Sequence, residues 1–409
     1  MTEAIQSYSQ LIALVGAAVL AALLARSLMS QLGLPAFTGY VAVGLTLGLL
    51  HQKLGILPIE VDVGFGFLAQ LGVIAILFKV GLESDLGLLV EKLAAAVAVW
   101  APDIVVSGAL CFALVYFWPG YGTSAAAFAG IAATATSIGV STAIWEDAGA
   151  LKTDQGALLI DVAELDDVSG VLLMSLLFAV APILAGADIG SVWPQVLKIA
   201  GYNFALLVVF CAGCYLFSRH VERPLTAWFA ERNPKAGALL FATASGLLIA
   251  AIADSAGFSV AIGALFAGLA FSRDPAERDI DRAFAGLHAF LSPFFFIGIG
   301  MSVDVTALMD GLVLGIGLFV AAAAGKVIGA GLPAAFLFGS RGGLLIGASM
   351  VPRAEIFLII MAQGAAMGPA AVPASLFAAA VFVSLASCVL APIVVQRLLA
   401  SDPGLERAA

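Results

Sequence analysis

The chain has 409 residues, of which 62% are hydrophobic and only 11% are charged, and its mean hydropathy is +1.10. Runs of about 18 or more apolar residues are typical of membrane-spanning helices, and such runs recur throughout the sequence. The net charge of −9 argues against a nucleic acid as a partner. The composition therefore excludes an ordinary soluble domain and predicts an all-α, polytopic protein of the lipid bilayer.

The apolar runs predict thirteen membrane-spanning helices joined by short loops. In chain order, their approximate bounds are 9–29, 34–51, 64–82, 92–117, 122–146, 157–184, 195–217, 236–254, 257–272, 285–302, 310–337, 342–366 and 372–397. Lys and Arg are enriched in the cytoplasmic loops of membrane proteins. With the N-terminus outside, 14 of the 18 Lys and Arg residues fall on the cytoplasmic side and only two fall outside. This asymmetry predicts an external N-terminus and a cytoplasmic C-terminus.

Two pairs of similar stretches indicate an internal repeat. GLPAFTGYVAVGLTLG (33–48) and GFSVAIGALFAGLAFS (257–272) both carry glycine at positions 1, 7 and 12, and GLESD (81–85) resembles GMSVD (300–304). Predicted helices 2 and 3 thus match helices 9 and 10. Because seven is an odd shift, the two copies have opposite orientations in the membrane. Inverted repeats of this kind are typical of secondary transporters.

Predicted helices 5 and 12 occupy corresponding positions in the two copies, and both are poor uninterrupted helices. Helix 5 contains Thr134 and Thr136 among other small polar residues, and helix 12 contains Pro352, Arg353 and Glu355. Proline removes a backbone donor from a helix, and Ser and Thr side chains can compete for backbone bonds. Broken helices within a membrane line cavities or are buried in protein. We therefore expect two broken helices, with Arg353 and Glu355 forming a buried ion pair.

Predicted helix 6 contains the acidic stretch DVAELDDVSG (161–170), and predicted helix 11 contains Lys326. Each charge near the membrane centre costs about 2.5–3.5 kcal/mol on insertion scales, so such charges are usually paired or functional. Asp166 and Asp167 point about 100° apart on a helix, which suggests that Asp166 pairs with Lys326 while Asp167 faces a cavity. The alternative is an ion pair that only fastens helices together. Asp103, in helix 4, is a further acid without an assigned role.

Asp161, Glu164 and Asp167 follow one another at three-residue intervals and would form a ridge on one side of helix 6. We interpret the ridge as the wall of a funnel that opens to the cytoplasm. A cation such as Na⁺ prefers oxygen ligands, and a carboxylate also binds a proton. One site could then hold either ion, and this competition gives antiport without a cofactor. The candidate metal ligand is Asp167, with Asp166, Thr134 and Thr136 close to it.

The sequence resembles the monovalent cation:proton antiporter-2 family, which includes Kef-type systems and bacterial sodium/proton antiporters. The similarity extends over nearly the whole chain. It rests on GLPAFTGYVAVGLTLG, FKVGLESDL, ATATSIGVST, ELDDVSGVLL, GFSVAIGALFAGLAFSR, SPFFFIGIGMSVD, GKVIG and VPRAEIFLI. The resemblance implies two crossed broken helices, an ion- and proton-binding role for Asp167, and a pairing of Asp166 with Lys326.

The resemblance also implies a homodimer in the bacterial inner membrane, with an elevator-like movement of a core. The dimer domain would comprise residues 1–91 (helices 1–3) and 236–304 (helices 8–10). The core would comprise residues 92–186 (helices 4–6) and 305–409 (helices 11–13 and a short C-terminal tail), and residues 187–235 would hold the linker helix 7.

The Asp-Asp pair with a lysine resembles the electrogenic branch, which exchanges two protons for one Na⁺, whereas Kef-type systems tend to carry Gln-Asp. A K⁺/H⁺ antiporter or Kef-like K⁺ efflux protein is the alternative, and Li⁺ is a further candidate ion. Asp161 and Glu164 depart from the family pattern. An intramembrane aspartyl protease would need its two acids on different helices, and a sodium-coupled symporter would need a roomy substrate pocket.

The funnel interpretation predicts the effect of Glu164→Gln. The substitution should raise the apparent KM for Na⁺ in reconstituted transport, and more at low than at high ionic strength, because salt screens long-range attraction. An unchanged KM at both ionic strengths would contradict the funnel.

Overall fold

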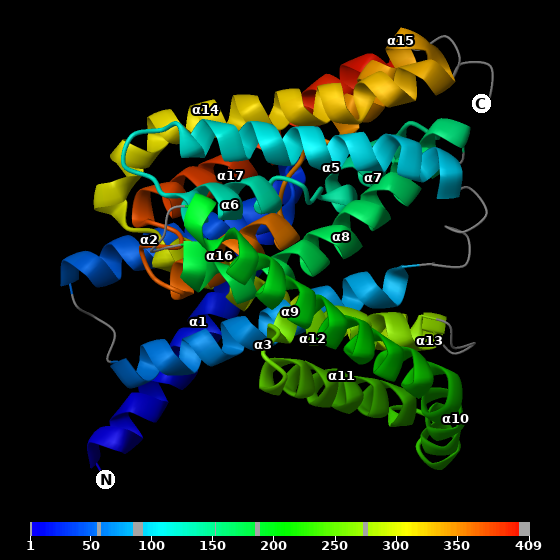
Figure 1. Ribbon diagram of the computed structural model, residues 1–409. Coiled ribbons are helices and arrows are strands. Elements are labelled where there is room, and N and C mark those ends of the chain that lie inside the picture. The colour runs from blue at the N-terminus through cyan, green and yellow to red at the C-terminus, as the bar shows by residue number, and fades with distance from the viewer. Residues whose placement is uncertain are drawn as a thin grey trace. The chain divides into compact units, whose positions relative to one another are not determined.

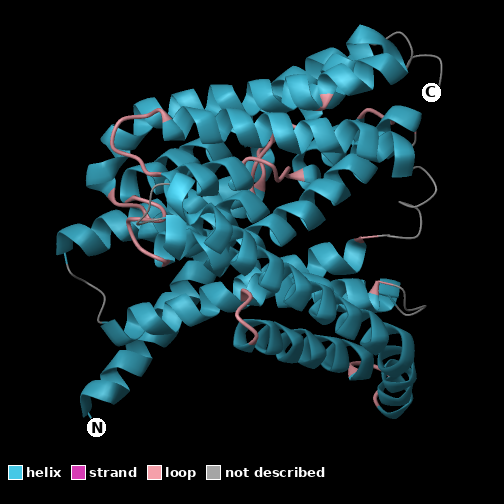
Figure 2. Ribbon diagram, viewed as in Figure 1, coloured by secondary structure: helices cyan, strands magenta, loops and turns pink. Residues whose placement is uncertain are grey.

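The computed structural model describes residues 2–54, 59–84, 93–151, 153–184, 189–272 and 277–400. Every regular element in these ranges is a helix (Figure 1, Figure 2). Ten helical segments are long and apolar enough to cross a membrane, and three apolar helices are shorter: α6 (Thr123–Ala132), α12 (Val260–Phe271) and α16 (Glu355–Ala366). The prediction of an all-α, polytopic protein is confirmed, whereas the number thirteen stays a prediction.

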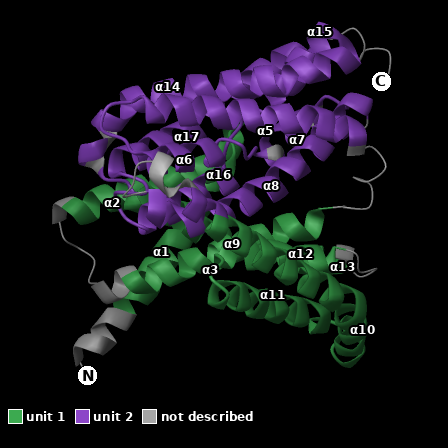
Figure 3. Cartoon of the chain, viewed as in Figure 1, with its two compact units in different colours: residues 1–85, 198–302 green, residues 86–197, 303–409 purple. Residues whose placement is uncertain are grey.

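The chain divides into two compact units, each made of two separate stretches (Figure 3). Residues 1–85 and 198–302 form the first unit, with α1 (Thr2–Gln31), α2 (Ala36–Leu54), α3 (Ile59–Glu83), a π-helical turn (Ser218–Glu222), α10 (Arg223–Arg232), α11 (Gly237–Ser255), α12 and α13 (Glu277–Ser302). Residues 86–197 and 303–409 form the second, with α5 (Leu93–Tyr116), α6, α7 (Ile138–Asp147), α8 (Asp154–Leu184), α14 (Val305–Gly329), α15 (Gly331–Ser349), α16 and α17 (Ala374–Ala400). Helix α9 (Ile189–Phe217) begins in the second unit and ends in the first.

In the first unit, two pairs of helices cross at glycines. Gly44 of α2 lies against Gly300 of α13, and Gly81 of α3 lies against Gly268 of α12. A Cβ atom at any of these glycines would collide with the backbone of the facing helix. The sequence repeat aligns Gly44 with Gly268 and Gly81 with Gly300. Each crossing therefore joins a helix of one copy to a helix of the other.

The remaining aligned glycines also have matching roles. Gly33 and Gly257 have positive φ angles of 68° and 88°, in the turns that precede α2 and α12. Glycine adopts this left-handed conformation without steric cost. Gly39 and Gly263 each lie against the helix before their own, α1 and α11 respectively. These equivalences agree with an internal repeat, and the opposite orientation of its copies stays a prediction.

Both segments that were expected to form broken helices are interrupted. Residues 133–137 separate α6 from α7, and residues 350–354 separate α15 from α16. The predicted helix at 310–337 corresponds to α14 and the first part of α15, because Ala330 between them keeps a helical conformation and its N–H donates to the Lys326 carbonyl at 2.9 Å. The break lies at Gly339 within α15, where φ is 77°. This residue falls in the short loop that was predicted between residues 337 and 342.

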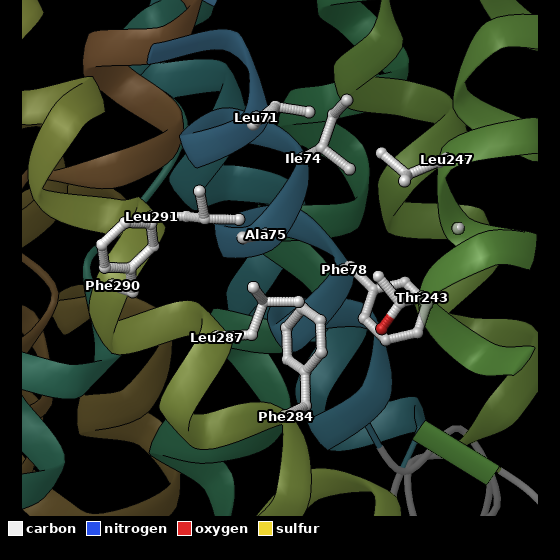
Figure 4. Close-up of a pocket in the computed structure, with 11 residues that line it drawn as sticks. Leu71, Ile74, Ala75, Phe78, Thr243, Leu247, Phe284, Leu287, Phe290 and Leu291 are labelled. Atoms are coloured by element: carbon white, nitrogen blue, oxygen red, sulfur yellow. The ribbon is translucent and has the colours of Figure 1, made fainter. Parts of the chain in front are cut away.

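An apolar pocket of about 230 Å³ lies between α3, α11 and α13 of the first unit (Figure 4). Phe78, Phe284 and Phe290 are among its lining residues, and none of the lining residues is charged. The Thr243 hydroxyl has no hydrogen-bond partner within the described ranges. The pocket lacks the oxygen ligands of a cation site, so the candidate functional residues lie elsewhere.

The glycine crossings predict the effect of a single methyl group on stability. Gly81→Ala in α3 should lower the free energy of unfolding by about 1–3 kcal/mol, because overpacking forces the backbones apart. The matched control is Gly66→Ala in the same helix, where an added Cβ meets nothing within 4 Å. Thermal unfolding in detergent should show a lower midpoint for Gly81→Ala alone. Equal midpoints would contradict the crossing.

Candidate ion-binding site

In the second unit, α14 lies along α5 (Figure 1). The sequence GKVIG places Gly325 and Gly329 one turn apart on α14, and a Cβ at these positions would press on Ser107 and Asp103 of α5 respectively. Gly-x-x-x-Gly spacing lets helix backbones approach closely in membranes. Lys326 follows Gly325 directly, so this packing brings its side chain to Asp103.

The Lys326 ammonium group is buried and donates three hydrogen bonds. Its Nζ atom lies 2.5 Å from Asp103 Oδ2, 2.6 Å from Asp166 Oδ2 and 2.8 Å from the carbonyl oxygen of Thr134. Lys326, Asp103 and Asp166 are all 0% exposed. The expected pairing of Asp166 with Lys326 is thus present, and Asp103 shares the same lysine. The three donors of the ammonium group are all used.

The two interruptions contact each other. The Ser137 N–H donates to the Pro352 carbonyl at 2.8 Å, and the Arg353 guanidinium donates to the Ala135 carbonyl. The last carbonyls of a helix lack partners within it and favour positive charge. Arg353 and Lys326 bind the carbonyls of Ala135 and Thr134 in the interruption that follows α6, where the chain has left the helix.

Two contacts differ from the predictions. Arg353 and Glu355 are both described, yet the structure contains no ion pair between them. Arg353 donates to the Ala135 carbonyl, and Glu355 Oε2 accepts a hydrogen bond from Ser137 Oγ at 3.1 Å. The Thr134 hydroxyl donates to the Ile131 carbonyl at 2.8 Å, so Thr134 meets Lys326 through its backbone oxygen.

The hydroxyl of Thr136 does lie at the carboxylates. Its Oγ1 atom donates to Asp166 Oδ2 at 2.7 Å, the same oxygen that accepts from Lys326.

Ser141 and Trp145 of α7 were not singled out from the sequence. They bind Ser349, at the end of α15, through its carbonyl and its hydroxyl respectively. Spacing within a single helix gives no signal for such contacts between the two broken segments.

Asp167 differs from its neighbour Asp166 in having no cationic partner in the part of the chain that the structure describes. It is 8% exposed, and its Oδ1 atom is buried without a hydrogen-bond partner among the described residues. Asp161 and Glu164 lie on the same helix, α8, and are half-buried. No group of three His, Cys, Asp or Glu residues in the described ranges could hold a metal ion. A cation at Asp167 would instead need hydroxyl, carbonyl or water oxygens beside the carboxylates.

The family model of the transmembrane sodium/hydrogen exchangers matches residues 18–401. The chain belongs to this family. The expected relationship to cation:proton antiporters is thereby confirmed.

Individual relatives agree with this assignment. The high-affinity Na⁺/H⁺ antiporter NhaS3 of Synechocystis is 27% identical over 310 residues, covering 74% of this chain and 64% of NhaS3. The chain thus matches somewhat less than two thirds of that relative. The Na⁺/H⁺-K⁺ antiporter GerN of Bacillus cereus is 28% identical over 349 residues, covering 84% of this chain and 85% of GerN.

The fold resembles that of a solved antiporter. The sodium proton antiporter MjNhaP1 of Methanocaldococcus jannaschii superimposes with a TM-score of 0.68 at 16% identity, covering 97% of this chain and 99% of MjNhaP1. At this identity the likeness establishes the fold alone. The family and the fold are those of transporters, not of enzymes.

The buried lysine predicts a large effect on stability. Lys326→Met should lower the free energy of unfolding by about 3–5 kcal/mol, because it leaves two buried carboxylates without their cation. The matched control is Lys79→Met in α3. Lys79 also binds two carboxylates, Glu83 at 2.6 Å and Asp281 at 2.9 Å, but these side chains are 21–55% exposed.

The control substitution should cost about 1 kcal/mol or less, because water screens the exposed groups. Thermal unfolding of the two variants in detergent measures the difference. Equal shifts would contradict the burial of the Lys326 cluster.

Proposed function

We propose that the protein exchanges Na⁺ for protons across the bacterial cytoplasmic membrane, at a site centred on Asp167 and Asp166. The observation that carries this proposal is the buried Asp167 carboxylate, next to a carboxylate that is bound by Lys326. One oxygen of Asp167 has no hydrogen-bond partner within the described residues. A carboxylate in this setting can be neutralised by a proton or by a cation. Either ion relieves the cost of a buried, unpaired charge.

Competition for the same oxygens couples the two ions. When Na⁺ binds, Asp167 gives up its proton, and the negative charge of Asp166 attracts the cation further. The Thr136 hydroxyl is hydrogen-bonded to Asp166, and its oxygen would serve as a further ligand of the cation. Asp161 and Glu164 add negative charge nearer the start of α8. This is the cytoplasmic side in the orientation that places the N-terminus outside.

The division of the chain into two units supports alternating access. Asp103, Thr136, Asp166, Asp167 and Lys326 all belong to the second unit. A movement of this unit as one body would carry the site without breaking its hydrogen bonds. We propose that this movement is elevator-like, that the first unit forms a homodimer, and that the two halves of the chain are inverted repeats, as their matching glycines suggest.

Two other functions receive less support. A K⁺/H⁺ antiporter is the alternative, because GerN is named for both Na⁺ and K⁺, and an Asp-Asp pair with a lysine favours Na⁺. An aspartyl protease needs two carboxyls that share a proton. Asp103 and Asp166 do approach from different helices, but the Lys326 ammonium lies between them.

The proposed site predicts that Asp167→Asn abolishes Na⁺-driven proton movement in proteoliposomes, because an amide cannot bind the exchanged proton. The matched control is Asp279→Asn in α13, whose side chain is 83% exposed, and it should exchange like the wild type. Wild-type exchange by Asp167→Asn would contradict the site.

The same proteoliposomes test substrate and charge. Parallel assays with Na⁺, Li⁺ and K⁺ separate the two antiporter proposals. Exchange of two protons for one Na⁺ moves net charge, so an imposed membrane potential should change the rate. An unchanged rate would contradict electrogenic exchange.

A further inference from the structure

Lys326 has two carboxylate partners, as Lys79 does, but the partners of Lys326 are fully buried. Its Nζ atom lies 2.5 Å from Asp103 and 2.6 Å from Asp166, and all three side chains are fully buried. A single carboxylate would suffice to neutralise one ammonium group. The second carboxylate adds a buried negative charge, which is costly unless it has a use.

Asp103 is held in place more firmly than its contact with Lys326 alone requires. Gly329 of α14 lies against the Asp103 backbone, and the Ser107 hydroxyl donates to the Asp103 carbonyl at 2.7 Å. The close packing of α5 on α14 therefore fixes Asp103 beside Lys326. The remaining oxygen of Asp103, Oδ1, has no partner among the described residues.

Asp166 has other contacts that suit it to bind a cation. Its Oδ2 atom also accepts a hydrogen bond from Thr136, and Asp166 adjoins Asp167 on α8. A cation that binds both aspartates would compete with Lys326 for Asp166. The ammonium group would then lose one of its three acceptors and keep the other two, Asp103 and the Thr134 carbonyl.

We propose that Asp103 is a positioning residue that holds Lys326 as an ammonium ion while Asp166 binds the transported cation. This inference rests on the proposed cation exchange. The proton balance at these residues is that Lys326 keeps its three protons throughout, Asp103 and Asp166 stay ionised, and the proton displaced by the cation leaves from the Asp167 carboxyl group. Without Asp103, release of Asp166 would leave a buried ammonium with only a neutral carbonyl as partner. Lys326 would then retain Asp166 or give up a proton.

The test is Na⁺-driven proton transport by Asp103→Asn in proteoliposomes at several pH values. At neutral pH the apparent KM for Na⁺ should rise at least about tenfold, with kcat near that of the wild type. Because Na⁺ binding would then also release a proton from Lys326, KM should fall about tenfold more per pH unit than in the wild type. Asp103→Glu should restore the wild-type slope.

A double-mutant cycle separates this role from a general effect of negative charge. Calorimetric Na⁺ affinity is compared for Asp103→Asn in the wild type and in a Lys326→Gln background. If Asp103 acts through the lysine, its substitution has no further effect in that background. An equal loss of affinity in both backgrounds would overturn the proposal, as would a wild-type KM and pH slope for Asp103→Asn.

A second variant tests the proposal independently if Asp103→Asn does not fold. Gly329→Ala keeps the Asp103 charge but places a Cβ 2.8 Å from Asp103 Cα, which must displace α5 from Lys326. It should raise KM in the same direction, and an unchanged KM would overturn the proposal. Absence of Na⁺/H⁺ exchange by the wild type would instead contradict the proposed function, so the two failures are distinguishable.

Discussion

The packing of the second unit depends on the three hydrogen bonds that the buried ammonium group of Lys326 donates. An isolated charge in the membrane is costly, and here it is bound by Asp103, Asp166 and the Thr134 carbonyl. These acceptors come from α5, α8 and the interruption after α6. One side chain thus joins three separate segments and satisfies part of a broken helix. Asp167, the next residue of α8, has no cationic partner among the described residues.

Glycines allow close helix packing in both units, but with different results. In the first unit, helices of the two copies of the repeat cross at glycines, where their backbones are in direct contact. In the second, Gly325 and Gly329 serve to bring charged groups together. Close backbone contact makes the first unit suitable as a scaffold, whereas the second holds every candidate ion-binding residue. This division provides the physical basis for the proposed movement of the site as one body.

Local pattern was sufficient to predict the helices, both interruptions and the Asp166–Lys326 pair, because hydropathy, proline and buried charge act within a few residues. It failed where contacts depend on how helices meet. Arg353 binds the Ala135 carbonyl in the interruption after α6 instead of Glu355, and Thr134 meets Lys326 through its backbone carbonyl instead of its hydroxyl. The partner of Asp103 could have been suspected, since GKVIG carries Lys326 on a close-packing motif. The break at Gly339 falls in the short loop that was predicted between residues 337 and 342.

The central claim is that Na⁺ and protons compete for one buried carboxylate site. The most direct measurement is calorimetric titration of the purified wild-type protein with Na⁺ in buffers of different ionisation enthalpy, which counts the protons released per ion bound. The account predicts that Na⁺ binding releases protons and that its affinity rises with pH. Na⁺ binding without proton release, at an affinity independent of pH, would contradict it.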